Sequence, residues 1–160
     1  MDIHSVFVSQ YRASITMLQE AIIKSPDALW DDSAHENKYW HIAYHTLFFT
    51  HLYLAPSESA FQPWPKGRKG YQDLSVKRRD VIYSKAELEE YTAFVFQRVH
   101  EGVNVPLQDA PNGFEWLPKF SRLELHLYNI RHIQHHTGQL ADRLKTANIG
   151  GPRWVGLVKE

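Results

Sequence analysis

The stretch SRLELHLYNIRHIQHHTGQLADRLKTA (residues 121–147) predicts one long amphipathic helix. It opens on Ser121-x-x-Glu124, a capping box whose Ser hydroxyl and Glu carboxylate satisfy amide groups that a helix start leaves unpaired. The helix is expected over residues 122–147, because two glycines and a proline follow at 150–152.

Three further segments have helical periodicity. Capping boxes at Ser33-x-x-Glu36 and Ser84-x-x-Glu87 predict helices over 34–54 and 85–101, the second of which is expected to stop before Gly102. A helix over 3–25 should stop before Pro26, since the residue before a proline is pushed out of helical geometry. Four helices in 160 residues predict one all-α domain (1–160) folded as a four-helix bundle.

The connection between the second and third of these helices is long: PSESAFQPWPKGRKGYQDLSVKRRDVIY (56–83). A stretch of this length is rarely structureless in a compact domain, and a bundle uses it as a crossover between helices. We expect its basic cluster to be a solvated loop rather than an anion site.

Composition narrows the classes of partner and cofactor. Lys plus Arg and Asp plus Glu number 18 each, so no basic surface favours nucleic acid or an anionic membrane. The longest apolar run, IAYHTLFFTHLYLA, is shorter than the ~20 residues of a membrane span, and no signal peptide is evident at the start. We therefore expect a cytoplasmic protein. The chain has no cysteine, so any metal must bind to His, Asp or Glu.

Two histidines of the last helix are expected to point inward. His132 and His136 lie one turn apart, ~40° from each other around the helix, beside Ile133 and Leu140. This spacing lets both imidazoles reach one ion, although a hydrogen-bonded pair of core histidines would have the same spacing. His135 falls on the polar side of the helix.

The second helix supplies a third inward histidine. His45 lies on its most apolar line, with Ile42 and Phe49. A neutral imidazole left without a partner there would cost ~1–3 kcal/mol, and a metal ion would satisfy it. His45, His132 and His136 are therefore the candidate metal ligands.

The other histidines have less distinctive positions. His41 precedes His45 by one turn and is within reach of a fourth ligand position, but we expect it to be a group that supports a ligand or a residue near the mouth of the bundle. His51 projects to the opposite side and is expected to be structural or interfacial. Surface or capping roles are expected for the rest, which are His4, His35, His100 and His126, although His126 lies at the edge of the core face.

Two known types of histidine metal site do not fit the chain. The di-iron carboxylate site needs Glu-x-x-His motifs, and no Glu here has a His three residues later. The HExxH motif is also absent, because Tyr39 stands where His35-Glu36 would need its second histidine.

Taken together, these residues resemble the DinB-like (DinB/YfiT) superfamily of metal-dependent proteins. The likeness is carried by WHIAYHTLFFTHLYL (40–54) and HIQHHTGQL (132–140). It implies an up-up-down-down-type bundle and a three-histidine divalent site with open coordination positions. It also implies the ligands His45, His132 and His136, the same three that the helical periodicity selects.

The resemblance also suggests a type of chemistry. Members with assigned roles are thiol-dependent transferases and isomerases that use bacillithiol, mycothiol or glutathione. It therefore implies a metal-dependent hydrolase or a thiol S-transferase acting on a small molecule, with a low-molecular-weight thiol as a partner. Imidazole ligands leave Zn, Ni, Fe and Mn open as the metal. The alternative is a non-catalytic metal- or ligand-binding stress-response protein.

The catalytic groups are not evident from the sequence. The nucleophile would be a metal-bound water or thiolate. Gln139 and Arg143 follow His136 on nearly the same face and would flank the ion, or Gln139 would support a ligand and Arg143 would be a solvated cation. Tyr128 and His41 are further neighbours that could assist.

Assembly can be predicted from the second helix, which is apolar nearly all round. Trp40, Tyr44 and Leu47 lie opposite the metal face, and such a helix must be covered on both sides. We expect a homodimer, or else cover by the long connection.

Overall fold

The computed structural model describes residues 2–77, 80–104 and 111–158, and in these ranges the chain is all-α. Apart from an isolated antiparallel bridge between Pro111 and Ser121, the described residues form no β structure. The helices, in chain order, are α1 (Ile3–Lys24), α2 (Asp27–Trp30), α3 (Tyr39–Leu54), α4 (Lys85–Val103) and α5 (Arg122–Thr146).

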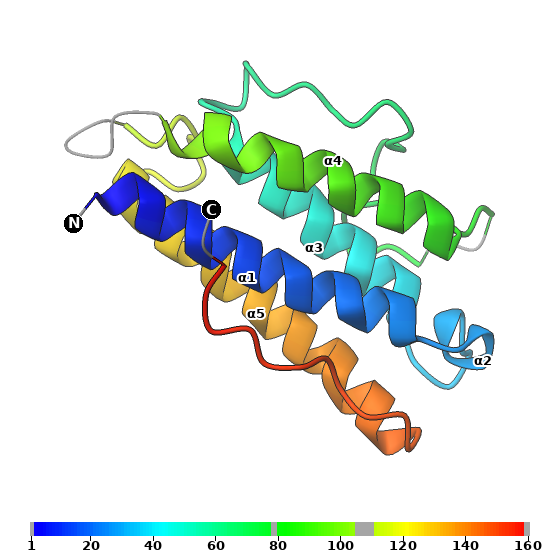
Figure 1. The fold of residues 1–160 in the computed structure, drawn as a ribbon. Coiled ribbons are helices and arrows are strands. Elements are labelled where there is room, and N and C mark those ends of the chain that lie inside the picture. Colours follow the sequence, from blue (N-terminus) through cyan, green and yellow to red (C-terminus); the bar gives the residue numbers. More distant parts are fainter. Residues whose placement is uncertain (1, 78–79, 105–110, 159–160) are drawn as a thin grey trace.

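The four long helices pack side by side, α3 against α4 and α5, and α1 against the same two (Figure 1). Their order of directions is up-down-down-up rather than up-up-down-down. The start of α3 lies against the end of α1, where the Tyr39 hydroxyl donates to the Ala21 carbonyl at 2.8 Å, so these two helices run antiparallel. At one end of the molecule the start of α1 meets the end of α4, where His4 Nδ1–H donates to the Val103 carbonyl at 2.8 Å.

The parallel course of α3 and α4 explains the long connection between them. The chain has to return along α3, whose 16 residues span ~24 Å, before α4 can start. On its way the connection covers the outer face of α3, where Tyr83 stacks on Tyr44 with ring centroids 4.5 Å apart. Trp40, Tyr44 and Leu47 are all 0% exposed in the single chain. This face therefore needs no second copy of the chain, and the homodimer stays a prediction.

Two of the three capping boxes are confirmed. Ser84 with Glu87 starts α4, and Ser121 with Glu124 starts α5, each with both reciprocal hydrogen bonds. The end of α1 is also as expected, since the helix stops at Lys24, ahead of Pro26.

The helix start predicted from the third capping box, Ser33 with Glu36, is wrong. Residues 34–38 are not helical, and α3 begins at Tyr39. Asp32 accepts a hydrogen bond from the Ala34 amide at 2.9 Å, and Lys38 Nζ donates to the carbonyls of Asp32 and His35. These bonds fold the segment into turns, which local sequence pattern did not distinguish from a helix start.

Gly102 was expected to follow the end of a helix, but it lies inside α4. A Cβ at this position would come within 2.7 Å of the Leu54 side chain and carbonyl. The glycine therefore allows the last turn of α4 to approach the end of α3. Gly102 serves this close packing and does not end the helix as predicted.

Arg122, the first residue of α5, joins the ends of α3 and α4. Its side chain is 0% exposed, and the guanidinium donates to the carbonyls of Leu54 and Ala55 at the end of α3 and of Gly102 in α4. It donates to the Asn112 carbonyl as well. Carbonyls at helix C-termini carry partial negative charge, so they stabilise the buried cation.

Within the described ranges, every helix is too short or too polar to span a lipid bilayer.

Replacing Arg122 should destabilise the fold strongly. We expect Arg122→Met to lower the free energy of unfolding by about 3 kcal/mol, because several buried carbonyls lose their donors at once. Arg131→Met, at an exposed position of the same helix, should change it by less than about 0.5 kcal/mol. Urea unfolding at neutral pH measures both, and equal stabilities would contradict this role.

Candidate metal centre

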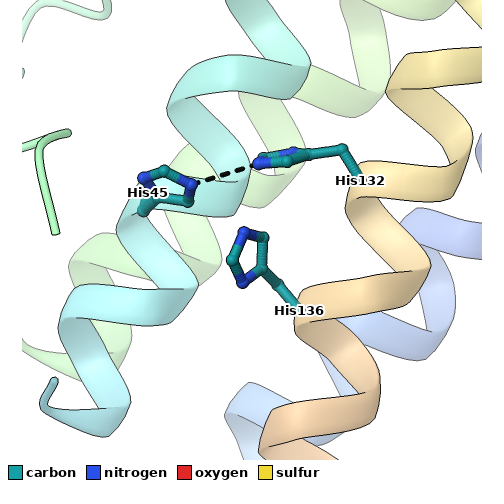
Figure 2. A group of neighbouring side chains, drawn as sticks. All are labelled: His45, His132 and His136. Atoms are coloured by element: carbon teal, nitrogen blue, oxygen red, sulfur yellow. Dashed lines mark hydrogen bonds between the residues drawn. The ribbon is translucent and has the colours of Figure 1, made fainter.

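Three histidines from two helices meet on one side of the molecule. His45 projects from α3 toward α5, and His132 and His136 project back from α5 (Figure 2). The ring centroids lie 4.6 to 5.1 Å apart. One ligand nitrogen from each of the three falls within 4.8 Å of the others. The structure thus brings together the three residues that the sequence predicts.

Hydrogen bonds fix the tautomer of two of the three rings. His45 Nδ1 lies 2.6 Å from the Gln72 carbonyl, and His136 Nδ1 lies 2.8 Å from Gln139 Oε1. Both partners are acceptors, so each Nδ1 must carry the proton. The Nε2 atom of each ring therefore carries a lone pair, as a metal ligand requires.

The third ring, His132, completes the pattern. Its Nε2 lies 3.1 Å from Nε2 of His45 (Figure 2), while its buried Nδ1 has no hydrogen-bond partner in the described part of the chain. Two nitrogens ~2.0–2.1 Å from one ion at tetrahedral or octahedral angles would lie ~2.9–3.4 Å apart. The His45–His132 separation fits this range, and a ligand nitrogen of His136 lies within 4.8 Å of both.

All three rings are held neutral. Burial lowers the pKa of His45 to about 4 and the pKa of His132 to about 3, and the other histidines of the group lower both further. Burial also lowers the pKa of His136. Protonated imidazole cannot bind a metal, so the burial that disfavours the charged form prepares the ligands.

The donor set fits one divalent ion that keeps room for other ligands. It consists of three neutral nitrogens, which suits zinc, nickel, iron(II) or manganese and does not select among them. His45 and His132 are partly exposed, so the group opens toward solvent. The ring of Phe49 packs against both, at 4.8 and 5.7 Å, and limits the opening on one side.

The predicted neighbours of the centre have several different roles. Gln139 holds His136, as described, and its amide nitrogen lies 3.3 Å from Nε2 of the exposed His135. Tyr128 stacks on His132 with ring centroids 6.4 Å apart. Arg143 donates to the Asn37 carbonyl at 2.7 Å and so fastens the turns before α3.

His41 lies outside the three-histidine group. Its Nε2–H donates to the Tyr71 carbonyl at 2.8 Å. His41 and His45 thus bind successive carbonyls of the connection, those of Tyr71 and Gln72. Gln72 is the residue of this site that the sequence did not reveal, because a backbone carbonyl contributes no side-chain signal.

Two other histidines lie in the core. His51 is buried against Phe61 and Phe94, with Nδ1 3.3 Å from the Tyr91 hydroxyl, which agrees with a structural role. His126 is 0% exposed, so the surface or capping role expected for it is wrong. Its Nδ1 lies 2.9 Å from the Tyr11 hydroxyl, since α1 packs over this face of α5.

The chain was compared with protein-family models, with curated proteins and with solved structures, and none of these matches it. The likeness to the DinB-like superfamily therefore stays a prediction from the motifs.

The buried histidines should make stability depend on pH. Burial lowers the pKa of His126 from 6.5 to about 3 in the folded protein. Below about pH 6.5 the unfolded chain binds a proton that the folded protein does not, so stability is lost as the pH falls toward 3. Each such histidine contributes a slope of up to ~1.4 kcal/mol per pH unit.

We therefore expect the free energy of unfolding of His126→Gln to fall less steeply between pH 6 and pH 4 than that of the unmodified protein. Urea titrations in the presence of a chelator measure it. The exposed His135→Gln on the same helix should keep the original slope. An unchanged slope in His126→Gln would contradict this prediction, because it would mean that His126 has the same pKa in the folded and unfolded protein.

Proposed function

We propose that the chain is a DinB-like four-helix-bundle metalloprotein that binds one divalent ion through His45, His132 and His136. We propose further that it transfers a low-molecular-weight thiol to a small electrophile. The observation that supports this most is that the three histidines are already in the state that binds a metal. All three imidazoles are neutral, and hydrogen-bond acceptors fix the proton of two of them on Nδ1.

The proposed reaction follows from the donor set. A divalent ion held by three neutral imidazoles keeps its double charge and lowers the pKa of a water or thiol that ligates it. The chain has no cysteine, so a thiol would have to come from a second substrate.

The surroundings of the ligands favour a thiol over water. Hydrolysis by such sites commonly uses a carboxylate as general base. Within the described residues, the hydrogen-bond partners of the three histidines include no carboxylate. The carboxylate of Asp73 is near enough to affect the pKa of His45, but it accepts hydrogen bonds from the amide and hydroxyl of Ser75. A thiol has a lower pKa than water and depends less on such a base.

The metal itself can be tested first. Protein purified without a histidine tag should contain about one divalent ion per chain by elemental analysis. The His132→Ala, His136→Ala double variant should lose it, because one imidazole cannot retain an ion. His135→Ala removes the exposed histidine between them and should keep full occupancy. Equal metal content in the double variant and the unmodified protein would exclude this centre.

The activity needs a separate assay. Metal-loaded protein should be incubated with epoxides, activated esters and aryl halides, each with and without glutathione, bacillithiol or mycothiol. We expect product only with a thiol, and a loss of at least about 100-fold in His45→Ala. Product formed equally well without a thiol would favour hydrolysis. No product from a metal-loaded protein would favour the non-catalytic alternative.

A further inference from the structure

A cavity of about 330 Å³ lies between α3, α4 and the connection that joins them. It lies on the other side of α3 from the histidine centre, and Gln72, whose carbonyl accepts the hydrogen bond from His45 Nδ1, is the residue that the two share. Tyr44 and His45 are adjacent in α3, yet the ring of Tyr44 contacts Tyr91 of α4 and that of His45 contacts His132 of α5. None of the three histidines of the centre lines this cavity.

The wall of the cavity is mainly aromatic and held in place by its own packing. Trp64 of the connection stacks on Tyr91 with ring centroids 4.4 Å apart and planes within 7°. Trp64 is 3% exposed and Tyr91 is 1% exposed, so both are fixed in the core. Tyr44, Phe48 and Phe61 extend the same wall. A preformed, concave aromatic wall is typical of small-molecule sites.

The charged groups at this cavity are cationic. Arg68 and Lys69 line it, and none of its described lining residues is acidic. Both belong to the basic cluster that the sequence predicted to be a solvated loop, but Arg68 is partly buried against Tyr83. The Arg68 guanidinium lies over the ring of Tyr83 at 4.3 Å, which sets its orientation. Its Nη1 is buried without a hydrogen-bond partner in the described structure, and Nη2 lies 3.8 Å from Glu87. Arg68 thus has hydrogen-bonding capacity left for an anion.

We propose that this cavity binds a planar aromatic ligand of about two fused rings that carries one carboxylate. A cavity of ~150 Å³ accommodates a benzene ring, so a volume of about 330 Å³ suits roughly twice that size. The rings of the ligand pack on Phe48 and Phe61, the partly exposed aromatic side chains of the wall, and the carboxylate is held by Arg68.

The charge preference can be measured with three probes that share one ring system. Isothermal titration calorimetry of the full chain should use 2-naphthoate, the neutral 2-naphthylmethanol and the cationic 2-naphthylmethylamine. We expect the anion to bind at least about tenfold more tightly than the cation, with the alcohol between them. Equal affinities, or no binding of any probe at millimolar concentration, would overturn the proposal.

Variants of Arg68 test whether this residue causes the preference for the anionic probe. Arg68→Gln should weaken 2-naphthoate binding about tenfold and leave the alcohol within about twofold, while Arg68→Lys keeps part of the preference. Lys66→Gln is the matched control, because Lys66 pairs with Glu90 and does not line the cavity. Circular dichroism and thermal melting confirm that each variant folds. Unchanged naphthoate affinity in folded Arg68→Gln would overturn the proposal.

A last variant separates this cavity from the histidine centre, which could also attract a carboxylate. The His132→Ala, His136→Ala double variant should bind 2-naphthoate within about twofold of the unmodified protein. Loss of binding there would place the ligand at the histidines and overturn this site. Retained binding with no metal in either protein would refute the proposed function alone.

Discussion

The hydrogen bond from His45 Nδ1 to the Gln72 carbonyl connects the two main features of the molecule. It fastens the long connection to α3, and it sets the tautomer of a buried histidine so that Nε2 faces α5. His41 makes the adjacent bond to Tyr71, so the connection is held at two successive carbonyls. Because the connection is fixed in this way, it covers the outer face of α3. The other helices cover only the inner face, so without the connection this apolar outer face would be exposed to solvent.

Different polar groups hold the two ends of the packed helices together. At one end Arg122 donates hydrogen bonds to the carbonyls at the ends of α3 and α4, and Gly102 lets those two helices approach each other closely. Toward the other end, Arg143 fastens the turns that precede α3. The histidine centre lies between them, on α3 and α5, whose relative position is therefore fixed before any ligand binds. Such rigidity is what a preorganised metal site needs.

Much of this architecture was predictable from the sequence, and the exceptions share a physical cause. Capping boxes and helical periodicity located α1, α4 and α5, and the one-turn spacing of His132 and His136 identified the inward pair. The errors arose where contacts between distant segments decide the outcome. The turns before α3 are held by Arg143 from the far end of the chain, and the burial of His126 depends on the packing of α1. The contribution of Gln72 comes from its backbone, so no pattern of side chains could reveal it.

The central claim is that three imidazoles share one ion and leave part of its coordination open. X-ray absorption at the zinc edge of zinc-loaded protein tests this most directly. We expect three imidazole nitrogens at ~2.0–2.1 Å, with the remaining ligands from solvent, and a new sulfur ligand at ~2.3 Å when a low-molecular-weight thiol is added. A spectrum with four imidazoles, or with fewer than three, would contradict it.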